Sequence, residues 1–193
     1  MTSTDVSVSQ NNLLFYDDFS NPRSGWSQWD GGQTQIAYQG GGLRFLIGEP
    51  HYDYWSLAGL EIKDAILAVE ARVVGGPPNN DFGLICRYQG PDQFYAFVVS
   101  SDGYTGIVAV DGDGYHILTD SGLTYVASVD RGLSTYLLRA DCVGSSLALY
   151  VDRQKLLEIE DHRYNSGDVG VFAGTFDETG VEVVFDNFYV LKP

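Results

Sequence analysis

The stretch AILAVEARVV, residues 65–74, decides the fold class, because its composition alone would also suit a helix. Every second residue from Leu67 to Val73 is apolar, whereas Glu70 and Arg72 fall on the opposite face. This period of two is typical of a strand with one buried face. The turn sequence GGPP follows at once and ends the segment. The stretch is therefore predicted to be a strand.

Short runs of the same kind follow one another along the chain, separated by turn signals such as Asp102-Gly103 and the three glycines at 40–42. No long amphipathic helix and no internal repeat interrupts them, which indicates an all-β, two-sheet antiparallel jelly-roll sandwich. The expected strands are 13–19, 34–39, 42–47, 54–58, 65–74, 81–89, 94–100, 105–110, 115–119, 134–142, 146–152, 155–160, 168–175 and 181–191.

The length of 193 residues fits one sandwich domain, expected over residues 13–193. Residues 1–12 are polar and predicted to be a flexible leader without the pattern of a secretory signal. If the protein is exported, the signal belongs to a longer precursor. The apolar runs have the length of strands, so no insertion into a membrane is expected.

Charge excludes some partners. The chain has 26 Asp and Glu against 11 Lys and Arg, a formal net charge of -15. Nucleic acids and anionic lipids require a basic surface, so neither is an expected partner. The carboxylates suit a hard cation such as calcium, or serve only to keep a β-rich protein soluble.

A series of motifs spans most of the chain, and its order resembles the concanavalin A-like, or laminin-G-like, jelly-roll superfamily. Most similar are the bacterial domains described as family-16-glycosidase-like or 3-keto-disaccharide-hydrolase-like. The motifs that carry the resemblance are YDDFS (16–20), GW (25–26), DFGLICRY (81–88), QFYAF (93–97), LRADCVG (138–144), LALYVD (147–152), GDVGV (167–171) and VFDNF (184–188). Relatives usually place Asn-Gly in the hairpin where this chain has Asp152-Arg153, so the turn type there stays open.

The resemblance implies a test for catalysis. Glycosidases of this fold carry their acids on one strand, as Glu-x-Asp-x-Glu or with one extra residue, and retaining enzymes need two carboxylates across the scissile bond. The nearest segments here, EIED (158–161) and EIKD (61–64), lack the third acid. No catalytic residue is therefore predicted, and a glycoside hydrolase-like enzyme remains the alternative.

The resemblance also implies a structural calcium ion between the first and last strands, held by Asp18, Asp186 and the carbonyl of Gly25. The alternative is that both carboxylates cap turns. Cys86 and Cys142 lie in separate strands and are either a disulfide or two buried thiols.

Exposed aromatic rings beside polar groups suit a sugar, whose C–H face is apolar. The candidate ligand-binding residues are Trp55, Arg87, Tyr95, Asp102, Tyr104 and Tyr115. Alternation places Arg87 on the face of Gly83 and Ile85, where a cation needs either solvent or an acidic partner, and Asp102 is one candidate partner. Each of these aromatics is more often a core or edge residue than a ligand contact. The sequence thus predicts a non-catalytic, extracellular or cell-surface binding module for carbohydrate or another surface ligand, within a longer exported protein. A structural or protein-interaction domain is a further alternative.

Overall fold

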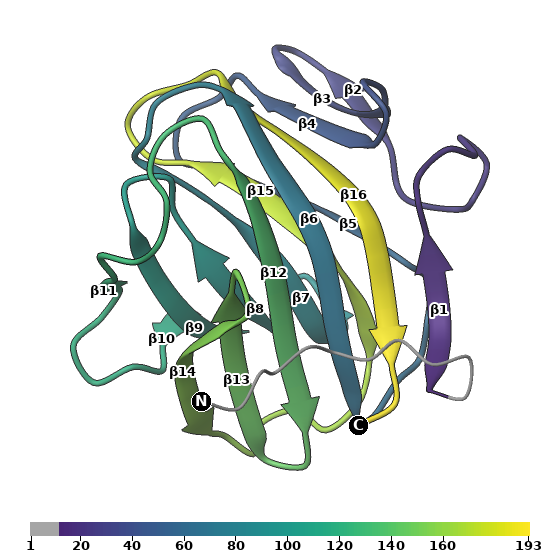
Figure 1. Ribbon diagram of the computed structural model, residues 1–193, viewed down its shortest axis with the longest axis vertical. Helices are drawn as coiled ribbons and strands as arrows, with labels where there is room; N and C mark the ends of the chain where they lie inside the picture. The colour runs from purple at the N-terminus through teal and green to yellow at the C-terminus, as the bar shows by residue number, and fades with distance from the viewer. Residues whose placement is uncertain (1–11) are drawn as a thin grey trace.

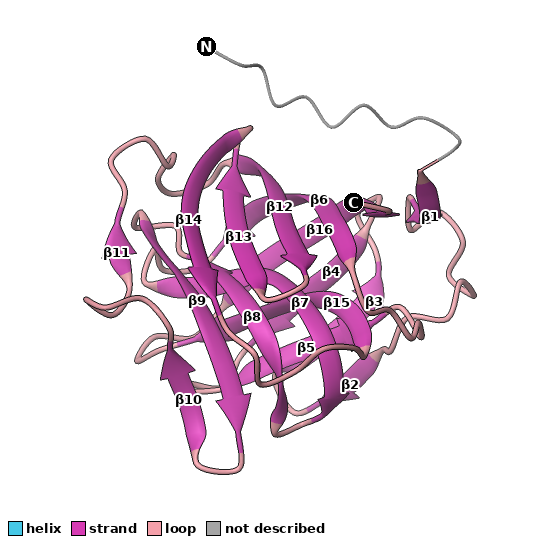
Figure 2. Cartoon of the chain, turned by 90° about the horizontal axis from the view of Figure 1, so that it is seen from below, coloured by secondary structure: helices cyan, strands magenta, loops and turns pink. Residues whose placement is uncertain are grey.

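The computed structural model describes residues 12–193, which form two packed antiparallel β-sheets and no helix (Figures 1 and 2). The all-β sandwich predicted from the sequence is confirmed. The first sheet runs in the order β14 (Gln154–Glu160), β13 (Ser146–Val151), β12 (Thr135–Val143), β6 (Ala65–Gly75), β16 (Val181–Leu191), β4 (Leu43–Ile47), β3 (Thr34–Tyr38) and β2 (Trp29–Gly31), with β1 (Leu13–Asp17) on β16. The second runs β10 (Gly114–Ile117), β9 (Tyr104–Asp111), β8 (Gln93–Val99), β7 (Asn80–Gly90), β15 (Asp168–Thr175) and β5 (Asp53–Leu57), with β11 (Thr124–Tyr125) on β9.

The stretch that decided the fold is strand β6, at the centre of the first sheet between β12 and β16. Leu67 and Val69 are buried against the second sheet, and Glu70, the next residue along the strand, is half-buried on the other face. All fourteen expected strands are present. The two short strands β2 and β11 were not predicted, because three and two residues are too few to show a period.

The main core lies between the sheets and is built by alternation from both of them. From the first sheet come residues such as Leu67 and Phe185, and from the second Phe82 and Phe97, all with essentially no exposed surface.

Of the expected leader, residues 1–11 lie outside the described residues, and the carbonyl of Asn12 accepts a hydrogen bond from the backbone of Lys192. The described residues contain no helix able to cross a membrane.

A disulfide joins Cys86 of β7 to Cys142 of β12, which settles the open question of the two cysteines. The bond links the two sheets across a sequence separation of 56 residues. Closing a loop of that length in the unfolded chain corresponds to about 4 kcal/mol of stability in the loop-entropy view.

The hairpin between β13 and β14 is tight despite its unusual sequence. Asp152 and Arg153 both have positive φ, 49° and 68°, as a two-residue type I′ turn requires. Asp152 also accepts a hydrogen bond from the backbone of Leu137, which helps to hold a backbone conformation that non-glycine residues disfavour.

Candidate functional site

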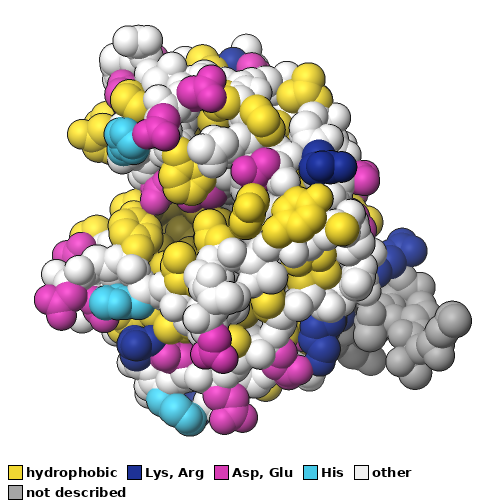
Figure 3. Space-filling model, turned by 90° about the vertical axis from the view of Figure 1, so that its left-hand side faces the viewer, with side chains coloured by type: hydrophobic (Ala, Val, Ile, Leu, Met, Phe, Trp, Pro, Cys, Tyr) yellow, Lys and Arg dark blue, Asp and Glu magenta, His cyan; other side chains and the backbone are white. Residues whose placement is uncertain are grey.

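A pocket of about 300 Å³ opens on the outer face of the second sheet, the face turned away from the main core. Figure 3 shows this side of the molecule hollowed, with hydrophobic side chains in the hollow and acidic side chains beside it. Most of the lining is apolar or aromatic and comes from Trp55, Ile85, Phe94, Val98, Val108 and Phe172.

The strands of this sheet are apolar on both faces. In β8, Tyr95 and Phe97 point into the main core, whereas Phe94, Ala96 and Val98 form a second apolar cluster on the pocket side. A strand buried on both faces is a continuous apolar run without polar alternation. The sequence of β8 therefore gave no sign that one of its faces lines a pocket.

Two carboxylates face each other at one end of the pocket. Gly174 of β15 is paired with Asp53 of β5 on one side and with Asp81 of β7 on the other. A Cβ at Gly174 would lie 1.9 Å from Asp53 Oδ1 and 2.2 Å from Asp81 Oδ1, so these two oxygens are no more than about 4.1 Å apart. The missing side chain at Gly174 is what lets both carboxyl groups lean over β15 toward each other.

Burial controls the protonation of this acid pair. It raises the pKa of Asp81 well above the ordinary value, and the negative charge of Asp53 raises it further. Burial also raises the pKa of Asp53, although hydrogen bonds from Tyr115 and Asp81 act against that shift. While both groups are ionised, Asp81 Oδ1 is buried with no hydrogen-bond donor among the described residues. One shared proton satisfies it, as in other close carboxyl pairs.

Tyr115 closes the site from the opposite edge of the sheet. It lies on β10 and shares the pocket lining with Asp53, toward which its hydroxyl is a potential hydrogen-bond donor. Burial raises the pKa of this hydroxyl, and the charge of Asp53 raises it further, so Tyr115 stays a donor at neutral pH. His51 lies at the rim, where its Nε2 is 3.5 Å from Asp177 Oδ1 and both side chains are exposed.

Backbone contacts fix the position of the acid pair. The N–H of Thr175 donates to the carbonyl of Tyr52, and the N–H of His51 donates to the carbonyl of Phe176, so the start of β5 is tied to the end of β15. On the other side, the buried amide of Asn80 donates to the carbonyl of Pro77 and fixes the start of β7.

Of the candidate ligand-binding residues, the structure brings Trp55 and Tyr115 together in the pocket. Arg87 lies elsewhere. The period-two count placed it on the face of Gly83 and Ile85, with Asp102 as a possible partner, but Arg87 has φ of 54° and sits at a register shift in β7. The alternation breaks there, and the side chain is fully buried.

Arg87 instead ties loops together at the end of the sandwich. Its guanidinium donates to the carbonyls of Lys63, Tyr164 and Gly144 and forms an ion pair with Asp64 at 3.3 Å. The prediction that Asp102 might pair with Arg87 is therefore wrong, and the role of Arg87 is structural.

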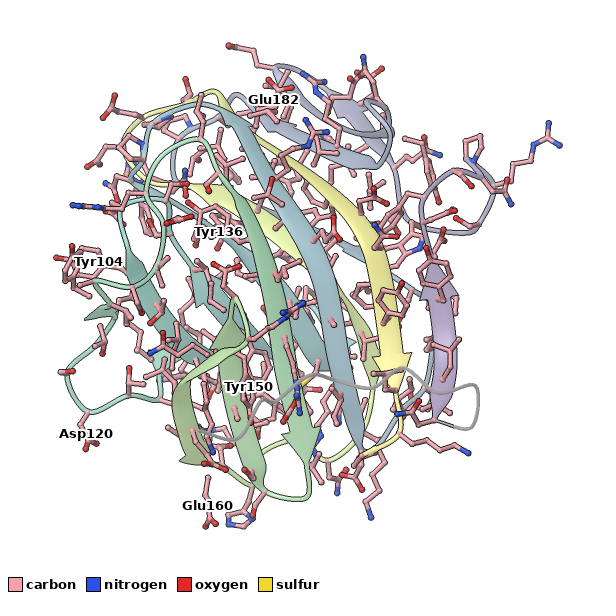
Figure 4. The ribbon with its side chains drawn as sticks, in the orientation of Figure 1. Tyr104, Asp120, Tyr136, Tyr150, Glu160 and Glu182 are labelled. Carbon is pink, nitrogen blue, oxygen red and sulfur yellow. A yellow bond between two sulfur atoms is a disulfide. The ribbon has the colours of Figure 1, made fainter. Side chains whose placement is uncertain are left out.

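The other three candidates are also outside the pocket lining. Tyr95 is in the main core, where its hydroxyl donates to Asp161 at 2.6 Å. Asp102 accepts a hydrogen bond from Ser100 in the turn between β8 and β9. Tyr104 is exposed at the outer edge of the second sheet and its ring packs against Tyr125 (Figure 4).

The acidic segments considered for catalysis do not form a pocket either. Glu158 is exposed on the edge strand β14, where it pairs with Lys155 at 2.7 Å. Glu160 projects from the end of the same strand, at the lower end of the molecule in Figure 4. These residues form a solvent-exposed strand edge.

The residues predicted to hold calcium lie at β1 and β16. Asp18 accepts a hydrogen bond from the N–H of Ser20, which lowers its pKa, and Asp186 accepts one from the N–H of Asn187. Within residues 12–193, no three or more His, Cys, Asp or Glu side chains gather as a metal site would require. Two carboxylates and the Gly25 carbonyl would leave most of the six to eight ligands of calcium to water. The ion stays a prediction.

Sequence reasoning missed the acid pair, although Asp81 opens the motif DFGLICRY that carries the family resemblance. The two acids are 28 positions apart on strands that are not neighbours, and only the pairing of each with β15 brings them together. A usable signal was Gly174 within the apolar run of β15, since an interior strand glycine often marks a close approach.

A row of aromatic rings was also missed. Trp29, Tyr54 and Tyr52 follow one another with ring centroids 6.1 and 6.3 Å apart. Trp29 and Tyr52 are exposed, and a shallow depression here shares Asp53 and Trp55 with the pocket. The row therefore borders the pocket across β5.

No protein-family model matches the sequence, and no curated protein matches it. Solved structures do resemble the chain. The carbohydrate-binding module CBM66 from Bacillus subtilis aligns over 88% of this chain and 96% of its own, with a TM-score of 0.70 and 15% identity. A glycoside hydrolase family 16 endo-glucanase from Bacteroides ovatus aligns over 93% and 100%, with a TM-score of 0.64 and 11% identity.

A third structure, a glycoside hydrolase family 43 protein from Bacillus licheniformis, aligns over 92% of this chain but only 39% of its own, with a TM-score of 0.69 and 15% identity. At such identities the likeness shows the fold. It confirms the resemblance to jelly-roll domains of the family-16-glycosidase-like kind.

Proposed function

We propose that the chain is a non-catalytic carbohydrate-binding domain and that the pocket on the second sheet is its binding site. The observation that carries the proposal is Asp81, a buried carboxyl group that opens into an aromatic pocket and has an oxygen without a donor. Such a group is costly to bury unless a ligand or a proton satisfies it. Sugar hydroxyls are suitable donors, and Trp55 and Phe172 offer rings for the C–H face of a sugar.

The placement of the acid pair supports binding over catalysis. Glycosidases that this fold resembles carry their acids on one strand, and retaining enzymes hold them across the scissile bond. Asp53 and Asp81 instead lie on two strands, β5 and β7, with β15 between them. Their facing oxygens are no more than about 4.1 Å apart and can share a proton. An extracellular or cell-surface location accompanies this proposal.

A glycan array with the full chain tests the proposal, run with calcium and again with chelator. We expect defined hits that disappear in Trp55→Ala, whose folding is checked by thermal melting, and persist in Tyr104→Ala, which alters an exposed ring outside the pocket. Loss of the hits in chelator would add the predicted calcium ion.

Two results would overturn the proposal. Release of sugar products from the array ligands would make the chain an enzyme. Silence on the whole array would favour the structural or protein-interaction alternative.

A further inference from the structure

The acid pair carries more information about the ligand than the rest of the pocket does. Asp53 and Asp81 together hold one positive charge, which in the free protein is the shared proton. Among the described residues that line the pocket there is no Lys or Arg. We infer, resting on the proposed function, that the pair recognises a protonated amine, so that the preferred ligand is a glycan containing hexosamine units with free amino groups.

The geometry suits an ammonium nitrogen. Charge-assisted N–H···O bonds are about 2.7–2.9 Å long, so one tetrahedral ammonium nitrogen can reach two oxygens separated by about 4.6 Å. The facing oxygens of Asp53 and Asp81 are closer than that, no more than about 4.1 Å apart. An ammonium group can thus bond to both carboxylates without any movement of β5 or β7.

The walls of the pocket add to the preference. Trp55 and Phe94 pack together with ring centroids 5.6 Å apart, and Phe172 stands in the same row of the sheet as Trp55. Aromatic faces attract cations, most strongly where water is excluded. An anionic sugar would meet the acid pair with no basic side chain to compensate, so uronic acids should be rejected.

Binding of an amine should release the shared proton. The ammonium takes the place of the proton, because its positive charge favours the ionised form of both carboxyl groups and its N–H groups bond to the oxygens that the proton joined. Other titratable groups near the pair are few: Tyr115 lies near Asp53, His51 is paired with Asp177 at the rim, and the charge of Asp92 acts on Tyr115. A neutral hydroxyl can bond to the pair without displacing anything.

The test compares three β-1,4-linked oligosaccharides of equal length by isothermal titration calorimetry with the full chain in chelator. These are oligomers of glucosamine, of N-acetylglucosamine and of glucose. We expect the glucosamine oligomer to bind about tenfold to a hundredfold more tightly than the other two. Titration in buffers of different ionisation enthalpy should show about one proton released per amine bound, and none for the neutral oligomers.

Asp81→Asn is the decisive variant, because its amide can donate to Asp53 as the protonated carboxyl does but cannot give up that proton. It should lose both the amine preference and the proton release, so that it binds the glucosamine oligomer no more tightly than the neutral oligomers. Equal affinity for all three oligomers without proton release would overturn this inference and leave the proposed function standing. Benzylamine, an amine without a sugar, is titrated in the same way. If it binds with proton release while no oligosaccharide binds, the proposed function is overturned.

Discussion

Tyr115 on β10 lies near Asp53 on β5, where burial and then the charge of Asp53 raise the pKa of the tyrosine hydroxyl. The two residues are joined by no backbone pairing, since four strands lie between them in the sheet. Both line the pocket, so their contact joins the two edge strands across the outer face of the second sheet. We expect a hydrogen bond between them to hold the hairpin of β9 and β10 over the acid pair.

Tyr115→Phe should therefore loosen that hairpin without unfolding the protein. The residue is 59% exposed, and one hydrogen bond contributes about 0.5–1.5 kcal/mol. We expect faster amide hydrogen exchange at 114–117 than in the wild type, measured by mass spectrometry. Tyr104→Phe, at another exposed tyrosine, is the control and should exchange like the wild type. Equal protection of the hairpin in both variants would show that the bond does not hold it.

Gly174→Ala should disrupt the site directly. The new methyl group would lie about 2 Å from an oxygen of each acid, so both side chains must move, at a cost of about 1–3 kcal/mol. Gly112→Ala is a matched control, since its added methyl would meet nothing within 4 Å. Urea denaturation measures both. If the two alanines are equally tolerated, the close approach of the carboxyl groups is wrong.

Removing the carboxyl group of Asp81 should make Gly174→Ala less destabilising. In Gly174→Ala with Asp81→Gly, the methyl group has one carboxyl fewer to displace, so the cost of the alanine should fall below its cost in the wild-type background. A double-mutant cycle over the four proteins gives the coupling.

The fold could be predicted from the sequence because strand alternation and turn residues are local signals, and β6 shows both. The site could not, and Arg87 shows why. A strand count predicts which face a residue occupies only while the alternation is unbroken, and the positive φ of Arg87 reverses it. Trp55 could be predicted as a ligand-binding residue because a large aromatic ring among polar neighbours can be recognised in the local sequence. Asp53 and Asp81 meet only through the pairing of β15, which no local pattern reveals.

Arg87→Met tests the structural role of that side chain. It would leave three carbonyl groups without the guanidinium donor and Asp64 without its ion-pair partner, and we expect a loss of about 3–5 kcal/mol in a urea denaturation. Arg72→Met, at an exposed arginine of β6, should change stability by less than about 0.5 kcal/mol. Arg87→Lys should fall between, since one ammonium cannot reach all four acceptors. Loss of ligand binding by a fully folded Arg87 variant would contradict the assignment.

The acid pair should also make stability fall as pH rises. Burial, with the charge of Asp53, raises the pKa of Asp81 well above 3.8 in the folded protein. At a pH between 3.8 and the raised pKa, the folded chain holds more protons than the unfolded chain. The stability gained from the protonated Asp81 is therefore complete below about pH 4 and is lost as pH rises through the raised pKa. Asp81→Asn cannot ionise. Its melting temperature relative to wild type should therefore climb steadily from pH 4 to pH 8.

Asp111→Asn should show the opposite dependence of stability on pH. Hydrogen bonds from Asp113 and His116 lower the pKa of Asp111, so its carboxylate stabilises the fold above the unfolded pKa, and this contribution is lost as pH falls. The melting temperature of Asp111→Asn relative to wild type should fall as pH rises toward about 4 and stay level above about pH 5. Comparing each variant with the wild type at the same pH cancels the effect of the large net charge. Parallel curves for Asp81→Asn and Asp111→Asn would show that Asp81 holds no proton in the folded protein.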